Sequence, residues 1–216
     1  MPTGKNRQVT EQVFSNIIQA SIILASASKS RRTMLENAGI FCLVQAADIK
    51  EAKIKKTMVR AGDSPEKISG ELARTKALVI SLNHPGQVIL AADQLLVCAG
   101  QIFDKPRDMA AAEKHLRFFR GKSHYLPTSY VLVRDQQVLM SQTVQPHLVM
   151  RNFSDEFLVD YLQKSGTKIL SSVGCYLLED LGSQLFSEIN GDYFAILGLP
   201  LLNVMENLRK LNILKT

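Results

Sequence analysis

A loop of small and hydroxyl-bearing residues precedes two adjacent arginines near the start of the chain. Residues 26–32 read SASKSRR, between an apolar run and a stretch with helical character. Free backbone N–H groups and the helix dipole favour an anion at a helix N-terminus, and arginine offers phosphate a two-pronged donor. Ser26, Ser28 and Arg31 are therefore candidate phosphate ligands. The alternative is an ordinary serine N-cap with solvated arginines, and the GxxxxGK spacing of a Walker loop is absent.

Asp93 interrupts an otherwise apolar stretch. Residues 87–98 read QVILAADQLLVC, which predicts a central strand buried on both faces. A carboxylate in such a strand is costly unless it is paired, hydrogen-bonded or bound to a metal ion. Buried carboxylates with a perturbed pKa are often functional, so Asp93 is the leading candidate for a catalytic residue. An aspartate that caps a loop at the strand end is the structural alternative, and these residues alone leave both interpretations open.

Three further charged residues complete a set suited to polyphosphate chemistry. Lys76 lies in LARTKALVI, Lys105 precedes a proline in FDKP, and Glu51 lies in ADIKEA. Taken alone, each of these residues is expected to be exposed, as charged side chains usually are. Together they offer cations for phosphate oxygens, while Asp93 and Glu51 offer carboxylates for a divalent cation. Cleavage of a phosphoanhydride requires this composition.

The elements that must position these residues alternate between strands and helices. Short apolar runs predict strands, and capping residues followed by apolar stripes predict helices. Strands are expected over residues 21–25, 41–44, 87–98, 130–133, 138–140, 148–150, 175–178 and 184–189. Helices are expected near residues 31–38, 65–82, 108–119 and 154–164, with a last helix from Pro200. The polar residues 46–56 are expected to form a loop or an exposed edge.

This interleaving predicts an α/β or α+β fold with a mixed sheet. Residues 1–20 are expected to form a partly helical N-terminal extension. Residues 21–216 are expected to form a single domain, and its size alone suggests two lobes around a cleft.

The composition restricts the class of partner and the compartment. The net charge of +6 favours polyanions, but the basic residues are dispersed and tryptophan is absent, which disfavours a nucleic-acid-binding protein. Cys42, Cys98 and Cys175 lie in apolar runs without metal or disulfide spacing, as expected for free thiols in a reducing compartment. The histidines also lack metal spacing, and only His124 is a candidate for a cleft wall. Without a signal peptide or an apolar stretch of ~18 residues, we expect a cytoplasmic protein that binds no membrane.

The order of these pieces along the chain resembles the motif series of the Maf family of nucleoside triphosphate pyrophosphatases. The pieces are ILASASKSRRTMLENAGI, ADIKE, LARTKA, AADQLLV, FDKP, GKSH, SSVGCYLLED and NGDYFAILGLPL, and the resemblance covers residues 22–208. No piece is specific alone, whereas the ordered series is. The resemblance implies an α/β fold similar to that of inosine triphosphate pyrophosphatases, with a central mixed twisted sheet flanked by helices, two lobes around a cleft, and often a homodimer.

The resemblance also implies a reaction and a role for each candidate residue. Water attacks the α-phosphorus of a nucleoside triphosphate, often a non-standard one, and pyrophosphate leaves with the help of Mg²⁺ or Mn²⁺. Asp93 matches the family's proton acceptor, and Glu51 joins Asp93 at the metal site. Positions that bind the triphosphate are matched by Ser26, Ser28, Arg31, Lys76 and Lys105.

The positions implied to select the base depart from the commonest family pattern. Gln94 replaces the threonine common in the branch that prefers methylated uridine or thymidine nucleotides. Gln94 with Glu179 is more like the branch that acts on 7-methyl-GTP, although that branch often has tryptophan where this chain has Ser30. The base therefore stays undecided. Asp104 stands where a glycine is usual, and we expect it to weaken phosphate contact by Lys105.

Two other classes of function remain as alternatives. A non-catalytic nucleotide-binding regulator of cell division or septum formation on the same scaffold would bind nucleotides without turning them over. A nucleic-acid-binding domain would show an affinity that falls steeply with salt. The combination of carboxylates and cations in one chain favours an enzyme over both.

Overall fold

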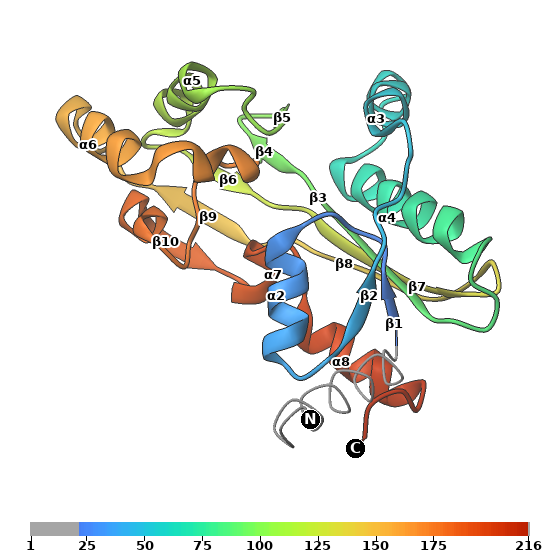
Figure 1. The fold of residues 1–216 in the computed structure, drawn as a ribbon. Coiled ribbons are helices and arrows are strands. Elements are labelled where there is room, and N and C mark those ends of the chain that lie inside the picture. Colours follow the sequence, from blue (N-terminus) through green and yellow to red (C-terminus); the bar gives the residue numbers. More distant parts are fainter. Residues whose placement is uncertain (1–21, 216) are drawn as a thin grey trace, which may run out of the picture.

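The computed structural model describes residues 22–215. The extension predicted over residues 1–20 lies outside the described residues, and the domain boundaries stay a prediction. Two five-stranded sheets follow each other along the molecule, with helices packed on their faces (Figure 1). The expected α/β class with a mixed sheet is confirmed, and a second, antiparallel sheet accompanies the mixed one.

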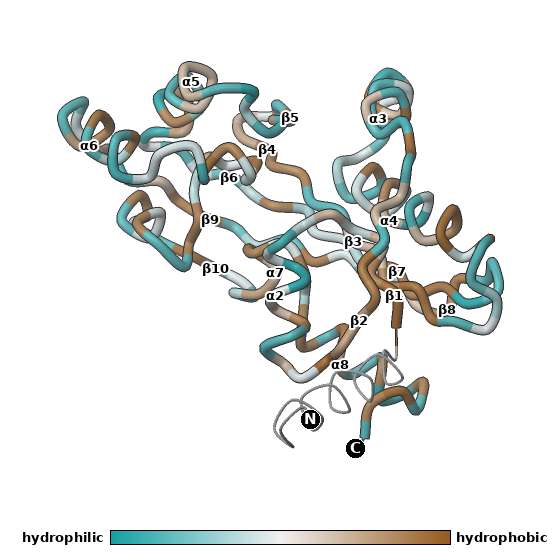
Figure 2. The backbone as a smooth tube through the Cα atoms, in the orientation of Figure 1, coloured by the Kyte–Doolittle hydropathy of each residue, from teal (hydrophilic) through white to brown (hydrophobic). Residues whose placement is uncertain are grey.

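The first sheet is mixed and is covered on both faces. Its order is β2 (Cys42–Val44), β1 (Ile22–Leu24), β3 (Ile89–Gln94), β7 (Thr128–Arg134) and β8 (Gln137–Val144). Strand β1 is parallel to β2 and β3, whereas β7 is antiparallel to β3 and β8. Helix α4 (Pro65–Ser81) packs on one face, while α2 (Lys29–Asn37) and α8 (Leu201–Lys210) cover the other. Strand β1 is accordingly hydrophobic along its length (Figure 2).

The second sheet is antiparallel and has its own core. Its order is β10 (Phe186–Asn190), β9 (His147–Met150), β6 (Ser123–Tyr125), β4 (Leu96–Cys98) and β5 (Gln101–Phe103). Helices α5 (Met109–Phe119) and α6 (Asp155–Ser165) contribute the apolar side chains Leu116, Phe119 and Leu158 to this core. Two 3-10 turns, η1 (Gly166–Ser171) and η2 (Leu181–Leu185), connect α6 to β10.

The long central strand expected around Asp93 is in fact two strands, β3 and β4, in different sheets. Gln94 is the last residue paired with β7 and Val97 the first paired with β6. The ladder is interrupted opposite Pro127, which has no N–H to donate, while its carbonyl accepts from the Leu95 N–H at 3.1 Å. Asp93 consequently lies where the chain passes from one sheet to the other.

The polar segment after β2 contains a helix where the sequence predicts a loop or an exposed edge. Helix α3 spans Glu51–Arg60. Ile54 and Met58 are one turn apart on it, and both pack beside the apolar side chains of α4 and Leu95. The prediction is wrong because these apolar contacts are enough to hold a helix whose other faces carry charged, solvated residues.

A second correction concerns residues 175–178, which form an irregular segment after a turn in place of the expected strand. Cys175 has a φ of 60°, and its N–H donates to the Ser172 carbonyl. This backbone conformation lies outside the β region, so no ladder forms there. The short strands β5 and β6, each of three residues, were in turn not predicted from the sequence.

The other predicted helices agree with the structure within a few residues. The side chains of Ser64, Asp108 and Ser154 cap α4, α5 and α6 by accepting a backbone N–H three residues ahead. Helix α8 begins directly after Pro200, and the short α7 (Tyr193–Ile196) precedes it. Over residues 22–215, no helix is long and apolar enough to cross a membrane.

Candidate active site

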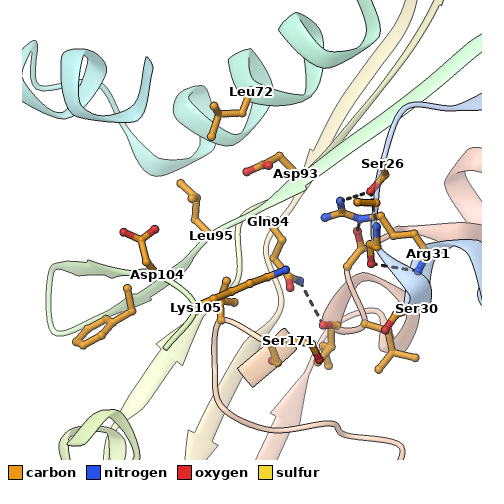
Figure 3. A pocket seen from close by; sticks show the side chains of 18 of the residues that line it. Ser26, Ser30, Arg31, Leu72, Asp93, Gln94, Leu95, Asp104, Lys105 and Ser171 are labelled. Atoms are coloured by element: carbon orange, nitrogen blue, oxygen red, sulfur yellow. Dashed lines mark hydrogen bonds between the residues drawn. The ribbon is translucent and has the colours of Figure 1, made fainter. Parts of the chain in front are cut away.

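A cavity of about 530 Å³ lies between the two sheets, within the range of ~300 to 1,000 Å³ usual for ligand pockets. Its walls come from the loop before α2, from α3 and α4, from the end of β3, from the loop after β5 and from residues near 171–179 and 196–198. The structure brings together on this lining every predicted site residue: Ser26, Ser28, Ser30, Arg31, Glu51, Lys76, Asp93, Gln94, Lys105 and Glu179. Figure 3 shows the part of the cavity around Asp93 and Arg31.

The loop between β1 and α2 is held in shape by its own serines. The Ser26 hydroxyl accepts the Ser28 N–H at 3.2 Å, and the Ser28 hydroxyl caps α2 by accepting the Arg31 N–H at 3.4 Å. The first-turn N–H groups of Lys29 and Ser30 have no acceptor inside the helix. The loop therefore presents backbone donors and the positive end of α2 to the cavity, as an anion site requires.

Arg31 is fixed by three hydrogen bonds, two of them to distant parts of the chain. Its Nε donates to the Gly198 carbonyl at 2.7 Å, and its Nη1 donates to the Ala92 carbonyl at 2.8 Å and to the Ser26 hydroxyl at 3.1 Å. Burial lowers the pKa of Arg31, while the nearby Asp93 and Glu51 raise it. The guanidinium is thus a pre-positioned cation beside the serine loop before α2, and it would lose little side-chain entropy on binding an anion.

Lys76 joins the two carboxylates at the floor of the cavity. Its Nζ lies 2.5 Å from Asp93 Oδ1 and 3.0 Å from Glu51 Oε1. The side chains of Lys76 and Asp93 are each 10% exposed, whereas Glu51 is 52% exposed at the first turn of α3. A buried carboxylate held by a buried ammonium has a defined orientation, and it costs less than an unpaired one.

The environment of Asp93 raises its pKa above the ordinary aspartate value. Desolvation by burial is the largest cause, and the Glu51 carboxylate adds to it. Lys76 and Arg31 act in the opposite direction because their charges stabilise the ionised form. A carboxylate with a raised pKa is a stronger base than an ordinary aspartate, which suits it to accept a proton from water.

Lys105 reaches into the cavity from the loop after β5 (Figure 3). Burial and the charges of Arg31 and Lys76 lower its pKa, which shows that these cations share one electrostatic field. Its neighbour Asp104 forms an ion pair with Lys55 of α3, a cavity residue that the sequence analysis does not single out. The acidic residue at this position therefore has a partner of its own.

Gln94 presents one particular atom to a ligand. Its Nε2 donates to Thr128 Oγ1 at 2.9 Å and to the carbonyl oxygens of Ala195 and Ile196 at 2.8 and 3.2 Å. Two backbone carbonyls require a donor, which fixes the orientation of the amide. All of these bonds use Nε2, so Oε1 is the atom that can accept a hydrogen bond from a bound molecule.

The opposite wall is partly apolar and comes mostly from the second sheet and the turns that follow α6. Phe103, Val173 and Leu178 line it, and Glu179 is exposed at its edge. Ser30 lies near the first turn of α2 and is partly buried. Apart from Ser30 and Glu179, these wall residues were not predicted from the sequence, because they come from the irregular segment after η1 and from the three-residue strand β5.

His124 lies behind this wall and not on it. The residue is 1% exposed, and its Nε2 is 2.8 Å from the hydroxyl of Tyr176, which does line the cavity. Burial lowers the pKa of His124 to about 4, so the ring is neutral near pH 7. The expectation of a cleft-wall histidine is therefore corrected: His124 supports a wall residue.

The carboxylates of Asp93 and Glu51 suit a metal cation whose other ligands are the phosphates of a bound substrate. In the part of the chain that the structure describes, no three or more His, Cys, Asp or Glu side chains gather into a complete metal site. Mg²⁺ commonly binds through one or two carboxylates together with substrate phosphates and water. Asp93 and Glu51, both in contact with Lys76, offer that donor set beside the serine loop before α2.

An α/β fold with carboxylates and fixed cations in one cleft, beside a helix N-terminus, defines a class of phosphate-binding hydrolytic enzymes. Comparison with known proteins is more specific, since the family described as Maf-like protein matches residues 21–211. The chain belongs to the Maf family.

Its relatives match along nearly their whole length. A nucleoside triphosphate pyrophosphatase of Paramagnetospirillum magneticum is 44% identical over 188 residues, which cover 87% of this chain and 97% of the relative. A protein of the same name from Granulibacter bethesdensis is 46% identical over 189 residues, covering 88% and 96%. A 7-methyl-GTP pyrophosphatase of Rhizobium etli is 40% identical over 190 residues, again covering 88% and 96%.

Proposed function

We propose that the chain is a nucleoside triphosphate pyrophosphatase that hydrolyses its substrate to the monophosphate and pyrophosphate in the cavity between the sheets. The observation that carries the proposal is the contact of Lys76 with both Asp93 and Glu51, next to Arg31 and the phosphate loop. The names of the relatives support the same reaction. A role in removing non-standard nucleotides is part of the proposal.

Asp93 acts as the proton acceptor for the attacking water. Its Oδ1 is held by Lys76, which leaves Oδ2 to take the proton. The water oxygen forms a bond to the α-phosphorus, and the bond from that phosphorus to the bridging oxygen of the leaving pyrophosphate breaks. Arg31 and Lys105 neutralise charge on the phosphates, while the serine loop holds them in place.

Asp93 and Glu51 are proposed to hold a divalent cation, Mg²⁺ or Mn²⁺, when the substrate binds. Such a cation would polarise the α-phosphate and neutralise its charge. The carboxylates also order Lys76, so that an ammonium stands beside the reacting group.

A base with hydrogen-bond donors on its edge is the proposed specificity, and 7-methylguanine is the first candidate. Gln94 Oε1 and the Glu179 carboxylate are both acceptors on the cavity lining, and guanine presents its N1–H and amino hydrogens to such groups. Relatives named 7-methyl-GTP pyrophosphatase support this choice. The chain has no tryptophan, so a base would stack on smaller groups of the apolar wall, such as Phe103.

Release of pyrophosphate from a panel of nucleotides tests the function. The panel contains GTP, 7-methyl-GTP, UTP, 5-methyl-UTP and dTTP with Mg²⁺ or Mn²⁺. We expect 7-methyl-GTP to be turned over fastest. We expect Asp93→Asn to lower kcat by about 10²- to 10⁴-fold, because the side chain keeps its shape but no longer accepts a proton.

Asp108→Asn is the matched control, since it makes the same change at an exposed cap of α5 where asparagine caps equally well. Wild-type turnover in Asp93→Asn would remove Asp93 from the mechanism. Binding of nucleotides without any turnover would favour the non-catalytic regulator.

A cytoplasmic location and a homodimer are further proposals. The free thiols of Cys98 and Cys175 are buried, which fits a reducing compartment, and the family resemblance implies the dimer. Light scattering of the purified chain decides the oligomeric state.

A further inference from the structure

Lys55 stands on the same face of α3 as Glu51, one helical turn away. Residues at this spacing are neighbours on a helix surface, and both line the cavity. The Lys55 side chain is only 19% exposed, unlike Lys56 beside it, which is exposed and absent from the lining. An ammonium that turns towards a cavity when solvent is within reach needs an explanation.

The ion pair of Lys55 with Asp104 crosses the mouth of the cavity. Helix α3 packs on α4 beside the first sheet, whereas Asp104 directly follows β5 of the second sheet. Figure 1 shows α3 beside α4, and β5 beside β4. Asp104 is 73% exposed, so its carboxylate can be returned to water when the pair separates.

The charged side chains on the cavity lining would leave phosphate oxygens free to bind one more basic side chain. The lining carries the basic side chains Arg31, Lys55, Lys76 and Lys105 and the acidic side chains Glu51, Asp93, Asp104 and Glu179. Lys76 is committed to two carboxylates, and Arg31 gives Nε and Nη1 to protein oxygens. Lys55 senses the same field, since burial lowers its pKa while Asp93 and Glu51 raise it.

We propose that Lys55 is a further substrate-binding residue. Its ammonium breaks the ion pair with Asp104 and binds oxygens of the two phosphates that are released as pyrophosphate. The inference rests on the proposed function, because it names a new ligand of the same substrate. Asp104 then acts as a resting partner that keeps the ammonium at the mouth of the empty cavity. When a polyanion enters the cavity, its phosphate replaces the solvent-exposed carboxylate of Asp104 as the partner of Lys55.

Calorimetric binding of inorganic pyrophosphate with Mg²⁺ tests the proposal without any turnover. Lys55→Gln is expected to weaken binding by about tenfold or more, because a charge-assisted hydrogen bond is lost. Lys56→Gln removes the same charge from the same helix outside the cavity, and it is expected to stay within about twofold of the wild type. Asp104→Asn is expected to tighten binding, since it frees Lys55.

The double variant Lys55→Gln with Asp104→Asn separates this effect from any effect of Asp104 on its neighbour Lys105. If Asp104 acts through Lys55, the tightening disappears in the double variant; if it persists there, the resting-partner role is wrong. Equal weakening by Lys55→Gln and Asp104→Asn would show a structural strap in place of a ligand. No change in Lys55→Gln would also overturn the proposal, and melting temperatures confirm that each variant is folded.

Failure of this inference and failure of the proposed function give different results. If the wild-type protein hydrolyses nucleotides of the panel but Lys55→Gln binds pyrophosphate with wild-type affinity, only the role of Lys55 is wrong. If Lys55→Gln loses affinity for pyrophosphate but the wild-type protein hydrolyses no nucleotide, only the catalytic function is wrong.

Discussion

At the scale of single residues, the proposed chemistry depends on the balance between burial and charge around Asp93. Burial makes its carboxylate a better base, but it also favours the protonated form, which cannot accept a proton. Lys76 is the largest force in the other direction, because its ammonium lies 2.5 Å from Oδ1. Lys76 therefore stabilises the ionised form of a carboxylate whose burial favours the protonated form.

Lys76→Met is predicted to shift the acid limb of the pH profile to higher pH. The pKa of Asp93 rises further when its main stabilising cation is removed, so the base is protonated at a pH where the wild type is active. We also expect kcat/KM at its optimum to fall by about 10² to 10³, since a charge near the reacting phosphate is lost.

Profiles of kcat/KM against pH for both proteins measure the shift. Arg74→Met, an exposed change on the same helix, serves as the control. An acid limb at the wild-type position in Lys76→Met would show that Lys76 does not set the ionisation of Asp93.

At the scale of elements, the cavity depends on where strands end and turns begin. The break between β3 and β4 opposite Pro127 places Asp93 near the end of the middle strand of the first sheet, and the turn at Cys175 brings residues 171–179 to the opposite wall. His124 of β6 supports this turn through the Tyr176 hydroxyl. Its Nδ1 has no hydrogen-bond partner among the described residues, so protonation of the ring there is unfavourable.

The buried His124 predicts a defined pH dependence of stability. Its pKa is about 4 in the fold against an ordinary 6.5, so its contribution is complete above pH 6.5 and is lost as the pH falls towards 4. This difference corresponds to about 3 kcal/mol of unfolding free energy.

His124→Phe is expected to flatten the fall in unfolding free energy over this pH range, measured by denaturant titration. His84→Gln, a change at a partly exposed histidine, should keep the wild-type slope. If the slope of His124→Phe equals that of the wild type, another group causes the acid sensitivity.

Local sequence rules predicted much of this framework. The caps at Ser64, Asp108 and Ser154 and the strand before the serine loop were predicted because their signals lie within a few adjacent residues. The break at Leu95, helix α3 and the turn at Cys175 were missed. The break at Leu95 depends on the remote carbonyl of Pro127, and α3 depends on apolar contacts with α4. The turn at Cys175 requires a positive φ, which the residue type does not predict.

All the candidate residues line one cavity, while their roles stay predictions. Lys55 was overlooked, since a lysine in a run of lysines has no distinguishing pattern in the sequence. Only the position of α3 relative to β5 shows that Lys55 faces Asp104 across the opening.

At the scale of the whole molecule, the two sheets contribute different parts of the site. Elements packed on the first sheet carry Ser26, Arg31, Lys76 and Asp93, which suit the phosphates and the reacting water. Residues from the second sheet and its turns, among them Val173 and Glu179, form the side where a base would lie. A nucleoside triphosphate that spans the cavity would place its α-phosphate between these halves, close to Asp93.

The position of bond formation is the central claim, and hydrolysis in ¹⁸O-labelled water tests it directly. Attack at the α-phosphorus predicts one ¹⁸O atom in the nucleoside monophosphate and none in the pyrophosphate, by mass spectrometry of a single turnover. Label in pyrophosphate, or release of labelled orthophosphate, would place the attack at the β- or γ-phosphorus and contradict the mechanism proposed for Asp93.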